Sequence, residues 1–435
     1  MKNDPHYMRL ALTLARRGYG GTSPNPMVGA VLVKNGNIIG RGWHRRAGLP
    51  HAEIEALRAA QSRKNNVRGA TLYVTLEPCS THGRTPPCTE AIIAAGLRKV
   101  IVGATDPNPK HAGRAFKILQ SAGIEVAHGI LADDCARLNE AFNHWIVHRT
   151  PFVTVKAAMT LDGKIATASG QSKWITGDQA RVFGMKLRRG ADAVLVGVNT
   201  VLADDPSLTF RPQAAGNSKA EPKSLRRIIL DSMARTPLTA KVVCDEFAGL
   251  TTLVVSQNAP KKGVAALAKR VNVLVAPLCE SPSLHPDPLR SHPMGAEREQ
   301  ESGKVRASRA KPQPPAGRHF LDLGWLLKHL GSENLTSILV EGGGETNASF
   351  LFNGLAQRVA FFYAPSILGG SGARKAVAGD GIKELSDAIQ LREIEWKTIG
   401  EDLMMTARVV DAEGPVAQTS KSAVSRVSKP ADRTI

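Results

Sequence analysis

The stretch Leu76–Ala91, LEPCSTHGRTPPCTEA, holds two of the five cysteines in this 435-residue chain. Eight residues separate Cys79 from Cys88, and two prolines directly precede the second cysteine. Upstream, the stretch PHAEIEA supplies His51 and, two residues later, Glu53. Imidazole nitrogens and thiolates are ligands that Zn²⁺ prefers in proteins. The sequence therefore predicts a zinc site built from His51, Cys79 and Cys88.

Three protein ligands leave the fourth position of a tetrahedral zinc ion open for a water molecule. Two of the ligands fall at or near the starts of predicted helices, where partial positive charge favours a thiolate. Glu53 is not needed as a ligand, so it can take a proton from that water and pass it to a departing amine. His-x-Glu followed by Pro-Cys and a further cysteine is the pattern of zinc-dependent deaminases. We therefore expect attack on an amidine-like ring carbon with release of ammonia.

The same residues also fit structural roles. Taken singly, His51 suits a helix cap, Cys79 a small buried hydrophobe and Glu53 an exposed helix position. A structural zinc ion would have a fourth Cys or His nearby, which His82 could supply. A zinc-stabilised binding module without catalysis would not need Glu53. The joint pattern on helix, loop and helix favours a catalytic site.

Composition limits the class of protein. The apolar runs are too short to span a bilayer, and the N-terminus, MKNDPHYMRL, lacks the apolar core of a signal peptide. Five cysteines spread over a long chain do not make a disulfide framework. These features predict a cytoplasmic protein without a membrane partner, and burial is the default expectation for Cys135, Cys244 and Cys279.

The net charge of +19 raises the alternative of a nucleic-acid base deaminase. That class has two residues between the cysteines and uses aromatic side chains to stack bases. Here the spacing is eight residues and the aromatic content is 5%. Part of the charge lies in 281–318 and 415–435, which lack aromatic residues and are expected to be a disordered insert and a disordered tail. We expect a small-molecule substrate and no nucleic acid.

Alternating strand and helix patterns predict two successive α/β domains, 1–148 and 149–414. In the first, MVGAVLVKNGNIIGRGW indicates a hairpin that turns at Asn35-Gly36, and 132–148 indicates one closing helix. In the second, the glycine run Gly342–Gly344 stands between a strand and a helix, where backbone N–H groups can bind a phosphate. The fingerprint G-x-G-x-x-G is absent from the sequence, so a Rossmann domain is not expected.

Nearly the whole chain outside 281–318 and 415–435 resembles the bifunctional riboflavin-biosynthesis deaminase/reductase family. In the first domain the matching stretches are SPNPMVGAVLV (23–33), GWHRRAGLPHAE (42–53), GRTPPC (83–88) and DPNPKHAGRA (106–115). In the second they are KAAMTLDGKIAT (156–167), SKWIT (172–176), GVNTVLADDPSLTFR (197–211) and VEGGGETNASF (340–350). The resemblance implies a cytidine-deaminase-like domain followed by a dihydrofolate-reductase-like domain, in a homodimer or larger homo-oligomer.

For the first domain, the resemblance implies deamination of 2,5-diamino-6-ribosylamino-4(3H)-pyrimidinone 5′-phosphate at its 2-amino group. His51, Cys79 and Cys88 match the zinc ligands of the family, and Glu53 matches the proton shuttle. The stretches that should line the pocket contribute further candidates, which are Asn25, His44, Ser80, His82, Asp106 and Asn108. Asn25 and Asp106 would equally suit turns beside their prolines.

For the second domain, the resemblance implies reduction of the ribosyl group to ribityl by NADPH. The positions that match cofactor contacts are Ala158, Trp174, Thr200, Asp204, Gly343, Gly344, Glu345, Thr346, Asn347, Ala348 and Ser349. The positions that match substrate contacts are Ser172, Arg188, Leu208, Arg211 and Glu341.

Two arginines and two further groups have predicted chemical roles in the reduction. Arg188 and Arg211 suit the 5′-phosphate because guanidinium groups bind phosphate through paired hydrogen bonds. Lys156 and Asp204 are candidates to orient or protonate the sugar. Structural alternatives are a favoured cation at a helix end for Arg188, a core position for Trp174 and a loop position for Asp204.

Overall fold

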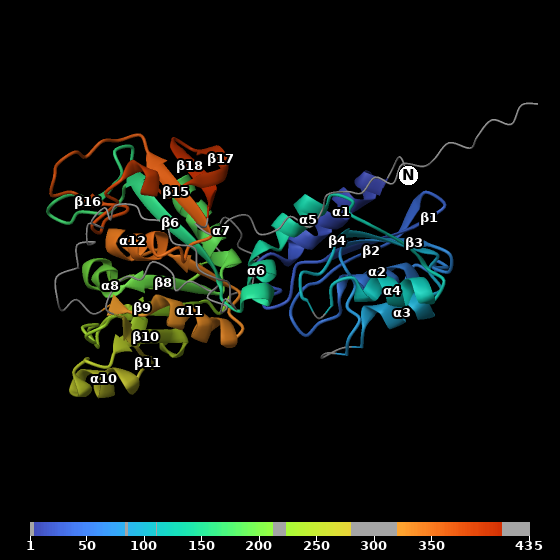
Figure 1. The fold of residues 1–435 in the computed structure, drawn as a ribbon, viewed down its shortest axis with the longest axis horizontal. Coiled ribbons are helices and arrows are strands. Elements are labelled where there is room, and N and C mark those ends of the chain that lie inside the picture. The colour runs from blue at the N-terminus through green and yellow to red at the C-terminus, as the bar shows by residue number, and fades with distance from the viewer. Residues whose placement is uncertain (1–3, 83–85, 110, 212–222, 280–319, 411–435) are drawn as a thin grey trace, which may run out of the picture.

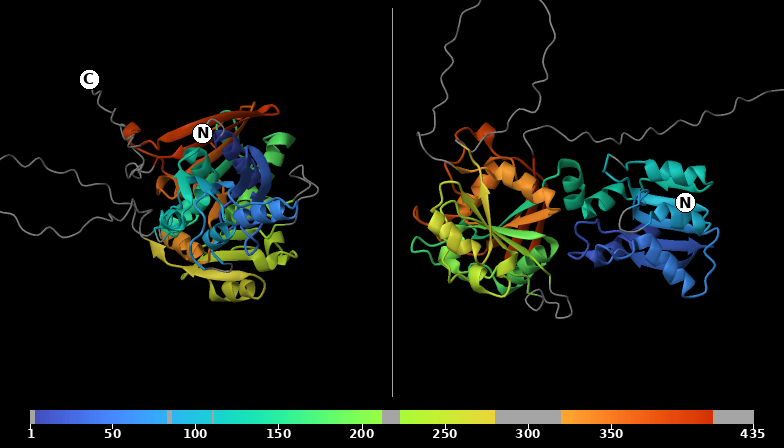
Figure 2. Two further views of the ribbon diagram at one scale, coloured as in Figure 1. Left: turned by 90° about the vertical axis from the view of Figure 1, so that its right-hand side faces the viewer. Right: turned by 90° about the horizontal axis from the view of Figure 1, so that it is seen from below.

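The computed structural model describes residues 4–82, 86–109, 111–211, 223–279 and 320–410. The predicted insert, 281–318, and the predicted tail, 415–435, lie outside these residues. The described chain folds into two α/β units that follow each other along the sequence and lie in separate lobes (Figures 1 and 2). The predicted fold class is confirmed.

The sheet of the first unit has, among the described residues, five strands in the order β2-β1-β3-β4-β5. The strands are β1 (Gly29–Lys34), β2 (Asn37–Trp43), β3 (Thr71–Leu76), β4 (Lys99–Ala104) and β5 (Glu125–His128). β1 pairs antiparallel with β2 and β3, whereas β3, β4 and β5 are parallel. The predicted turn between β1 and β2 is present, with φ of 50° at Asn35 and 77° at Gly36. Positive φ at both positions is what a two-residue hairpin loop requires.

Helices cover both faces of this sheet. Successive strand residues point to opposite sides, and the strands carry apolar residues on both sides. The helices are α1 (Asp4–Ala15), α2 (Ala52–Gln61), α3 (Cys88–Ala94), α4 (Arg114–Ser121), α5 (Ala132–Leu138) and α6 (Glu140–His148). Leu32 and Leu72 pack with α2, α3 and α4, whereas Val31 and Tyr73 pack with α1 and α5. Figure 1 shows the two helical layers on either side of the strands. The apolar strands are therefore buried on both faces.

The sheet of the second unit has nine strands within the described ranges, in the order β11-β10-β9-β8-β14-β6-β15-β18-β17. The strands are β6 (Phe152–Thr160), β8 (Ala193–Gly197), β9 (Arg226–Leu230), β10 (Thr251–Ser256), β11 (Asn272–Ala276), β14 (Ser337–Val340), β15 (Arg358–Ala364), β17 (Leu391–Ile399) and β18 (Asp402–Val409). Neighbours pair in parallel from β11 to β15, and β18 and β17 close the sheet as an antiparallel hairpin. The sheet is therefore mixed.

Helices also cover both faces of this second sheet. They are α7 (Asp178–Gly190), α8 (Val198–Asp204), α9 (Lys241–Cys244), α10 (Lys261–Ala268), α11 (Leu323–Ser332) and α12 (Gly344–Phe352). Leu195 and Val340 pack with α11 and α12 on one face, and Val194 and Ile229 pack with α8, α9 and α10 on the other. α7 packs on the hairpin side, where Phe183 contacts Phe362. No helix in the described ranges combines the length and apolarity needed to cross a bilayer.

Two short ladders lie beside the second sheet. β7 (Lys164–Ala166) pairs antiparallel with β16 (Arg374–Lys375). β12 (Leu278–Cys279) pairs antiparallel with β13 (Phe320–Leu321), so that Leu278 lies opposite Leu321 and Cys279 opposite Phe320. The second ladder therefore joins the chain on either side of residues 280–319.

The prediction of one helix over 132–148 is wrong, because the helix breaks at Asn139 into α5 and α6. The Asn139 side chain accepts a hydrogen bond from the Met27 N–H (2.8 Å) and donates one to the Met27 carbonyl (2.9 Å). Its backbone leaves the helical region at a φ of −115°. Asparagine side chains compete for backbone groups in this way, so the break follows from a contact with a distant loop.

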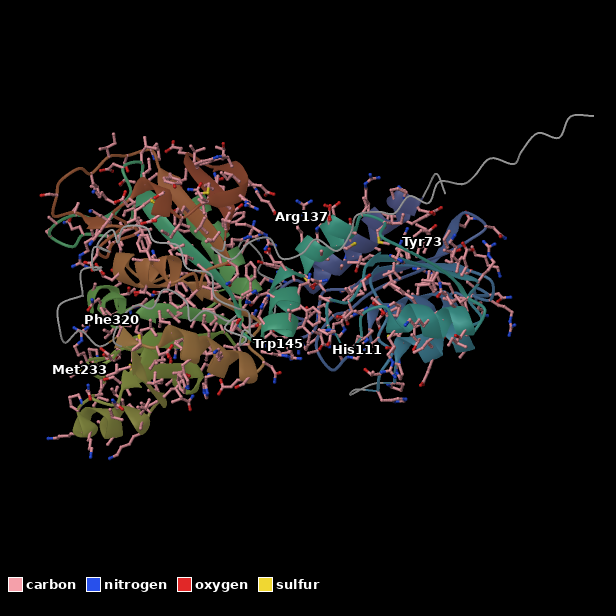
Figure 3. The ribbon with its side chains drawn as sticks, viewed as in Figure 1. Tyr73, His111, Arg137, Trp145, Met233 and Phe320 are labelled. Atoms are coloured by element: carbon pink, nitrogen blue, oxygen red, sulfur yellow. The ribbon has the colours of Figure 1, made fainter. Side chains whose placement is uncertain are left out.

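The two units meet through α6 and the loop that follows α1. The indole N–H of Trp145 donates to the carbonyl of Gly331 in α11 (2.9 Å), and the Tyr19 hydroxyl donates to the Lys186 carbonyl in α7 (3.2 Å). A Cβ on Gly331 would lie 2.0 Å from the Arg149 carbonyl oxygen, so only glycine fits there. Figure 3 shows Trp145 at the junction.

The cysteines outside the zinc pattern differ in burial. Cys135 is fully buried, as expected, and Cys279 is half-buried. Burial of Cys244 is a wrong prediction, because this residue is exposed at the end of the short helix α9. Val242 and Val243 occupy the inner face of α9 instead.

Candidate active sites

The predicted zinc ligands lie together in the first unit. His51 Nδ1 is 3.5 Å from Cys79 Sγ and 3.3 Å from Cys88 Sγ. Zinc–sulfur and zinc–nitrogen bonds of about 2.3 and 2.0 Å place tetrahedral ligands roughly 3.5–3.8 Å apart. In the part of the chain that the structure describes, the ligand atoms of His51, Cys79 and Cys88 all lie within 4.8 Å of one another. The separations fit a single zinc ion.

Local structure places each of these ligands. His51 is the N-cap of α2, Cys79 follows β3, and Cys88 is the first residue of α3. The Cys88 N–H at this helix start donates to Cys79 Sγ at 3.2 Å. Hydrogen bonds from Cys88, and the neighbouring His51 ring, lower the pKa of Cys79 despite its burial. The arrangement therefore favours the thiolate form of Cys79, which is the form that a metal ion needs.

Glu53 lies beside the ligands on the first turn of α2 and is 3% exposed. Among the described residues, its Oε2 has no hydrogen-bond partner. Burial, with a smaller contribution from Cys79, raises the pKa of Glu53 to about 7. A buried polar atom normally has a partner, so this oxygen suits a bound water or substrate group. The carboxyl also titrates where a general acid–base can work in both directions.

These groups face a cavity of about 250 Å³. The predicted residues that line it are Asn25, His44, His51, Glu53, Cys79, Asp106 and Asn108. The other lining residues are Pro26, Val28, Leu76, Glu77, Thr81, His111 and Phe142. The cavity has the size and the mixed polarity of a site for a small molecule.

Hydrogen bonds fix the orientation of the polar side chains in the wall of the cavity. Asn25 Nδ2 lies 3.1 Å from His44 Nε2, and His44 Nδ1 lies 3.2 Å from the Pro50 carbonyl. The His44 ring packs edge-on against the His51 ring, with centroids 5.2 Å apart. Burial lowers the pKa of His44, which favours a neutral ring. Asn25 and His44 can thus offer hydrogen bonds to a ring held beside the metal site.

Two predicted pocket residues, Ser80 and His82, are not among the residues that line this cavity. The His82 ring pairs with the Glu90 carboxylate at 3.2 Å, with 73% of its side chain exposed. Since the ligand group found among the described residues is His51, Cys79 and Cys88, His82 does not supply a fourth ligand there. The Ser80 hydroxyl is buried, and within the described residues it has no hydrogen-bond partner.

Sequence reasoning missed Glu77, His111 and Phe142. The Glu77 carboxylate accepts hydrogen bonds from the N–H groups of Asp106 (3.2 Å), Gly113 (3.0 Å) and Ala115 (3.0 Å), so it holds the loop that lines the cavity. Glu77 and His111 both lie in stretches already singled out, and their polarity was the available signal. Phe142, in α6, carries no such signal. Figure 3 shows His111 on the side of the first unit that faces the second.

In the second unit, Arg188 and Glu341 form a buried ion pair. Arg188 Nε and a terminal nitrogen each donate to the Glu341 carboxylate at 2.9 Å, and the other terminal nitrogen donates to the Thr209 carbonyl at 3.0 Å. Burial alone would raise the pKa of Glu341, but the charges of Arg188 and Lys156 outweigh it and hold the pKa at about 2. The fork of Arg188 therefore engages Glu341, which limits what it can offer to a phosphate.

Ser172 and Asp204 also come together, as the Ser172 hydroxyl donates to the Asp204 carboxylate at 2.9 Å. Trp174 is 71% exposed, so the core alternative for it is wrong. The Arg181 guanidinium lies over its ring at 4.5 Å. An exposed indole beside Ser172 and Asp204 can contact a ligand.

The glycine run begins α12 and brings it against the ends of two strands. A Cβ on Gly197 would lie 2.7 Å from Thr346 Oγ1, and one on Gly342 would lie 2.4 Å from Thr346 Cβ. A Cβ on Gly343, by contrast, would meet nothing within 4 Å. The first N–H groups of a helix have no intrahelical acceptor. The open space at Gly343 therefore fits a phosphate at the start of α12.

Several residues of the second unit that were predicted to contact a ligand are buried. Leu208 and Ala348 are 3% and 4% exposed, so neither residue offers much surface to a ligand. The Asn347 side chain is buried and donates to the Ala376 carbonyl at 2.8 Å. The remaining positions, which are at least partly accessible, are Lys156, Ala158, Thr200, Arg211, Glu345 and Ser349.

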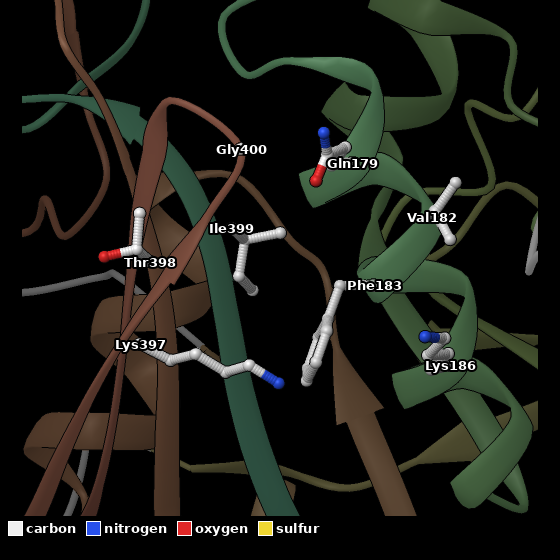
Figure 4. A pocket seen from close by; sticks show the side chains of 8 residues that line it. All are labelled: Gln179, Val182, Phe183, Lys186, Lys397, Thr398, Ile399 and Gly400. Carbon is white, nitrogen blue, oxygen red and sulfur yellow. The ribbon is translucent and has the colours of Figure 1, made fainter.

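A further hollow of about 290 Å³ lies between α7 and the β17–β18 hairpin (Figure 4). Its lining residues are Gln179, Val182, Phe183, Lys186, Lys397, Thr398, Ile399 and Gly400. This lining contains none of the predicted site residues. The hollow is therefore separate from both candidate sites.

Comparisons with known proteins agree with this division. The model of the RibD C-terminal domain matches residues 151–405, and that of the cytidine and deoxycytidylate deaminase zinc-binding region matches residues 1–104. The riboflavin biosynthesis protein RibD of Actinobacillus pleuropneumoniae is 39% identical over 94% of this chain and 96% of its own length. The corresponding figures for RibD of Escherichia coli are 36%, 92% and 98%.

Solved structures also match this chain over both units. RibD of Acinetobacter baumannii has a TM-score of 0.75 at 33% identity, covering 94% of this chain and 99% of its own. A diaminohydroxyphosphoribosylaminopyrimidine deaminase/5-amino-6-(5-phosphoribosylamino)uracil reductase of Thermotoga maritima has a TM-score of 0.73 at 31% identity, with the same coverage. From the metal-ligand group, the two-unit fold and these full-length matches, the chain belongs to the RibD family of bifunctional riboflavin-biosynthesis deaminase/reductases.

Proposed function

We propose that this protein deaminates 2,5-diamino-6-ribosylamino-4(3H)-pyrimidinone 5′-phosphate and then reduces the ribosyl group of the product to ribityl. The observation that carries the first step is the Glu53 Oε2, which has no hydrogen-bond partner among the described residues and lies beside His51, Cys79 and Cys88 at the cavity. The name of the Thermotoga maritima relative supports this choice of substrate.

In the deamination, His51, Cys79 and Cys88 hold the zinc ion. When bound, zinc lowers the pKa of a water molecule toward neutrality. Glu53 takes the two protons of the attacking water in turn and delivers one to the ring nitrogen beside the carbon and the other to the 2-amino group, which leaves as ammonia while the water oxygen becomes the carbonyl oxygen. Asn25 and His44 bind polar edges of the ring beside the metal site.

In the reduction, NADPH supplies a hydride when bound. The N–H groups at the start of α12 bind its phosphates, and Ser172 and Asp204 orient the ribose. Arg211, which is exposed, takes the 5′-phosphate of the substrate. Arg188 holds the Glu341 carboxylate in place through its two hydrogen bonds. Placement of the two reactants is the main contribution of the protein to such a step.

The setting of the enzyme is part of the proposal. A cytoplasmic location is supported by its five cysteines, all of which are free. The substrate is a small phosphorylated pyrimidine and not a nucleic acid. A homodimer or larger homo-oligomer is the expected assembly, and sedimentation velocity tests it.

The test follows ammonia release and NADPH oxidation separately in the full-length protein. Glu53→Gln should keep zinc, stop ammonia release and leave reduction of the deaminated substrate intact. Glu55→Gln, on the same helix and paired with Arg45 and Arg58, is the matched control and should leave both steps unchanged. Ammonia release by Glu53→Gln at the wild-type rate would refute its role. Release only from tRNA or single-stranded DNA would refute the substrate.

A further inference from the structure

The loop that carries Asn25 is held at both ends. At one end, the Ser23 hydroxyl donates to Asp192 Oδ2 in the second unit at 2.8 Å. At the other end, Met27 forms two hydrogen bonds with the side chain of Asn139, between α5 and α6. Asn25 lines the deaminase cavity between these two anchors. One wall of the cavity therefore takes its position from residues outside it.

Asp192 is itself fixed by the second sheet. Its Oδ2 also accepts hydrogen bonds from the Thr336 N–H (2.8 Å), the Thr336 hydroxyl (2.7 Å) and the Ser337 N–H (3.2 Å). Its side chain is 13% exposed. These bonds place the carboxylate at the start of β14, the strand that leads to Glu341 of the reductase site. Ser23 thus docks on a rigid part of the reductase unit.

α6 contributes a second link. The Glu140 carboxylate pairs with the guanidinium groups of Arg358 in β15 and Arg408 in β18, and is 15% exposed. Both guanidinium groups also lie over the Phe152 ring, at 5.9 Å. Glu140 follows Asn139 directly, so this ion pair fixes the end of α6 that holds the loop.

The same helix supplies an apolar wall of the cavity. Phe142 lines the cavity and contacts Trp145, with ring centroids 6.4 Å apart. Trp145 in turn donates to Gly331 of α11. The two walls, Asn25 and Phe142, are thus both attached to the reductase unit, Asn25 through Ser23 and Phe142 through α6.

We propose that Asp192, Arg358 and Arg408 of the reductase unit are positioning residues for deamination, acting through Ser23 and Glu140 on the cavity walls Asn25 and Phe142. The proposal rests on the deaminase function proposed above. None of the three lines the cavity. The zinc ligands and Glu53, which carry out the chemical step, belong to other elements, namely the start of α2, the start of α3 and the loop after β3. Loss of the contacts should therefore weaken substrate binding more than it slows the chemical step.

The test uses full-length Arg358→Met/Arg408→Met. We expect the KM of deamination to rise roughly five- to tenfold, the factor that corresponds to about one displaced hydrogen-bonding group. The kcat of deamination should fall less than the KM rises, zinc content should be unchanged, and the kinetics of reduction of the deaminated substrate should stay within about twofold. Arg358→Lys/Arg408→Lys keeps both charges and should recover most of the binding.

Arg226→Met is the matched control, since Arg226 pairs with Glu333 at the surface of the reductase unit. It should leave deamination unchanged. Ser23→Ala is a second, milder variant that spares the arginines: its KM of deamination should rise, and Ser23→Thr, which keeps the hydroxyl, should restore it. If the double variant does not fold, the KM of deamination in Ser23→Ala tests the proposal instead.

The proposal is overturned if deamination kinetics stay within twofold of wild type in the double variant and in Ser23→Ala. It is also overturned if both activities fall in parallel, because that result indicates a general loss of stability. Failure of the proposed function looks different, since wild-type protein itself would then release no ammonia from the pyrimidine nucleotide.

Discussion

Replacing Glu341 with glutamine should destabilise the reductase unit strongly. The change leaves the Arg188 guanidinium, whose side chain is 11% exposed, without an ionised partner. The pKa of Glu341 falls from an ordinary 4.5 to about 2. At about 1.4 kcal/mol per pKa unit, the carboxylate contributes roughly 3 kcal/mol to folding near neutral pH. Breaking a buried ion pair from one side costs about 3–5 kcal/mol, which agrees.

Scanning calorimetry of the full-length protein measures this loss. For a unit of this size, about 3 kcal/mol corresponds to a fall in Tm of roughly 6–12 °C. Glu333→Gln is the control, because it breaks the more exposed pair with Arg226 and should cost less than about 1 kcal/mol. The double variant Arg188→Met/Glu341→Leu removes both charges and should recover much of the lost stability.

The pH dependence gives a second check. Because the pKa of Glu341 is lowered on folding, its stabilisation is complete above about pH 4.5 and is lost as the pH falls toward 2. The difference in Tm between wild type and Glu341→Gln should therefore shrink below pH 4.5. A Tm within 2 °C of wild type at neutral pH, or a difference that does not shrink in acid, would refute the reasoning.

Three further predictions concern the metal, the substrate phosphate and the junction. Removing zinc with a chelator should stop ammonia release but leave NADPH oxidation with the deaminated substrate, and added zinc should restore the first activity; loss of both activities would contradict separate sites. Arg211→Ala should raise the KM of reduction about tenfold or more with little change in kcat, because it removes a charge-assisted contact to phosphate; an unchanged KM removes Arg211 from the phosphate site. Burial, together with His148 and Arg408, lowers the pKa of His144 from 6.5 to about 4, so the unfolded chain binds more protons between these values and stability should fall as the pH drops through that window. His144→Gln should give a flatter curve of Tm against pH, and an identical curve would show that another group is responsible.

The residue types and spacing around Cys79 and Cys88 were enough to predict the metal-ligand group, since each ligand sits at a helix start or in a short loop whose local sequence places it. The Asn35-Gly36 turn could be predicted as well, because asparagine and glycine are the residues that most easily adopt the positive φ values of such a turn. Alternating strands and helices then gave the fold class. In these cases the local sequence carries the signal, even though the ligands His51 and Cys88 lie 37 residues apart.

Features that depend on contacts between distant residues could not be predicted from the sequence. The helix break at Asn139 exists because its side chain finds Met27, which lies 112 residues earlier. Phe142 lines the cavity only because α6 is held against the second sheet. Likewise, the guanidinium of Arg188 donates to the carboxylate of Glu341, 153 residues away, and no local pattern indicated this ion pair.

The β12–β13 ladder has a practical consequence for protein engineering. Because backbone pairing at Cys279 and Phe320 keeps the two chain ends adjacent, whatever connects them need only start and finish at one point on the surface. The entropy of closing such a loop grows slowly, by about 0.6 kcal/mol for each doubling of length. A fluorescent reporter or an affinity module whose own termini lie close together should therefore be tolerated there without disturbing either catalytic centre.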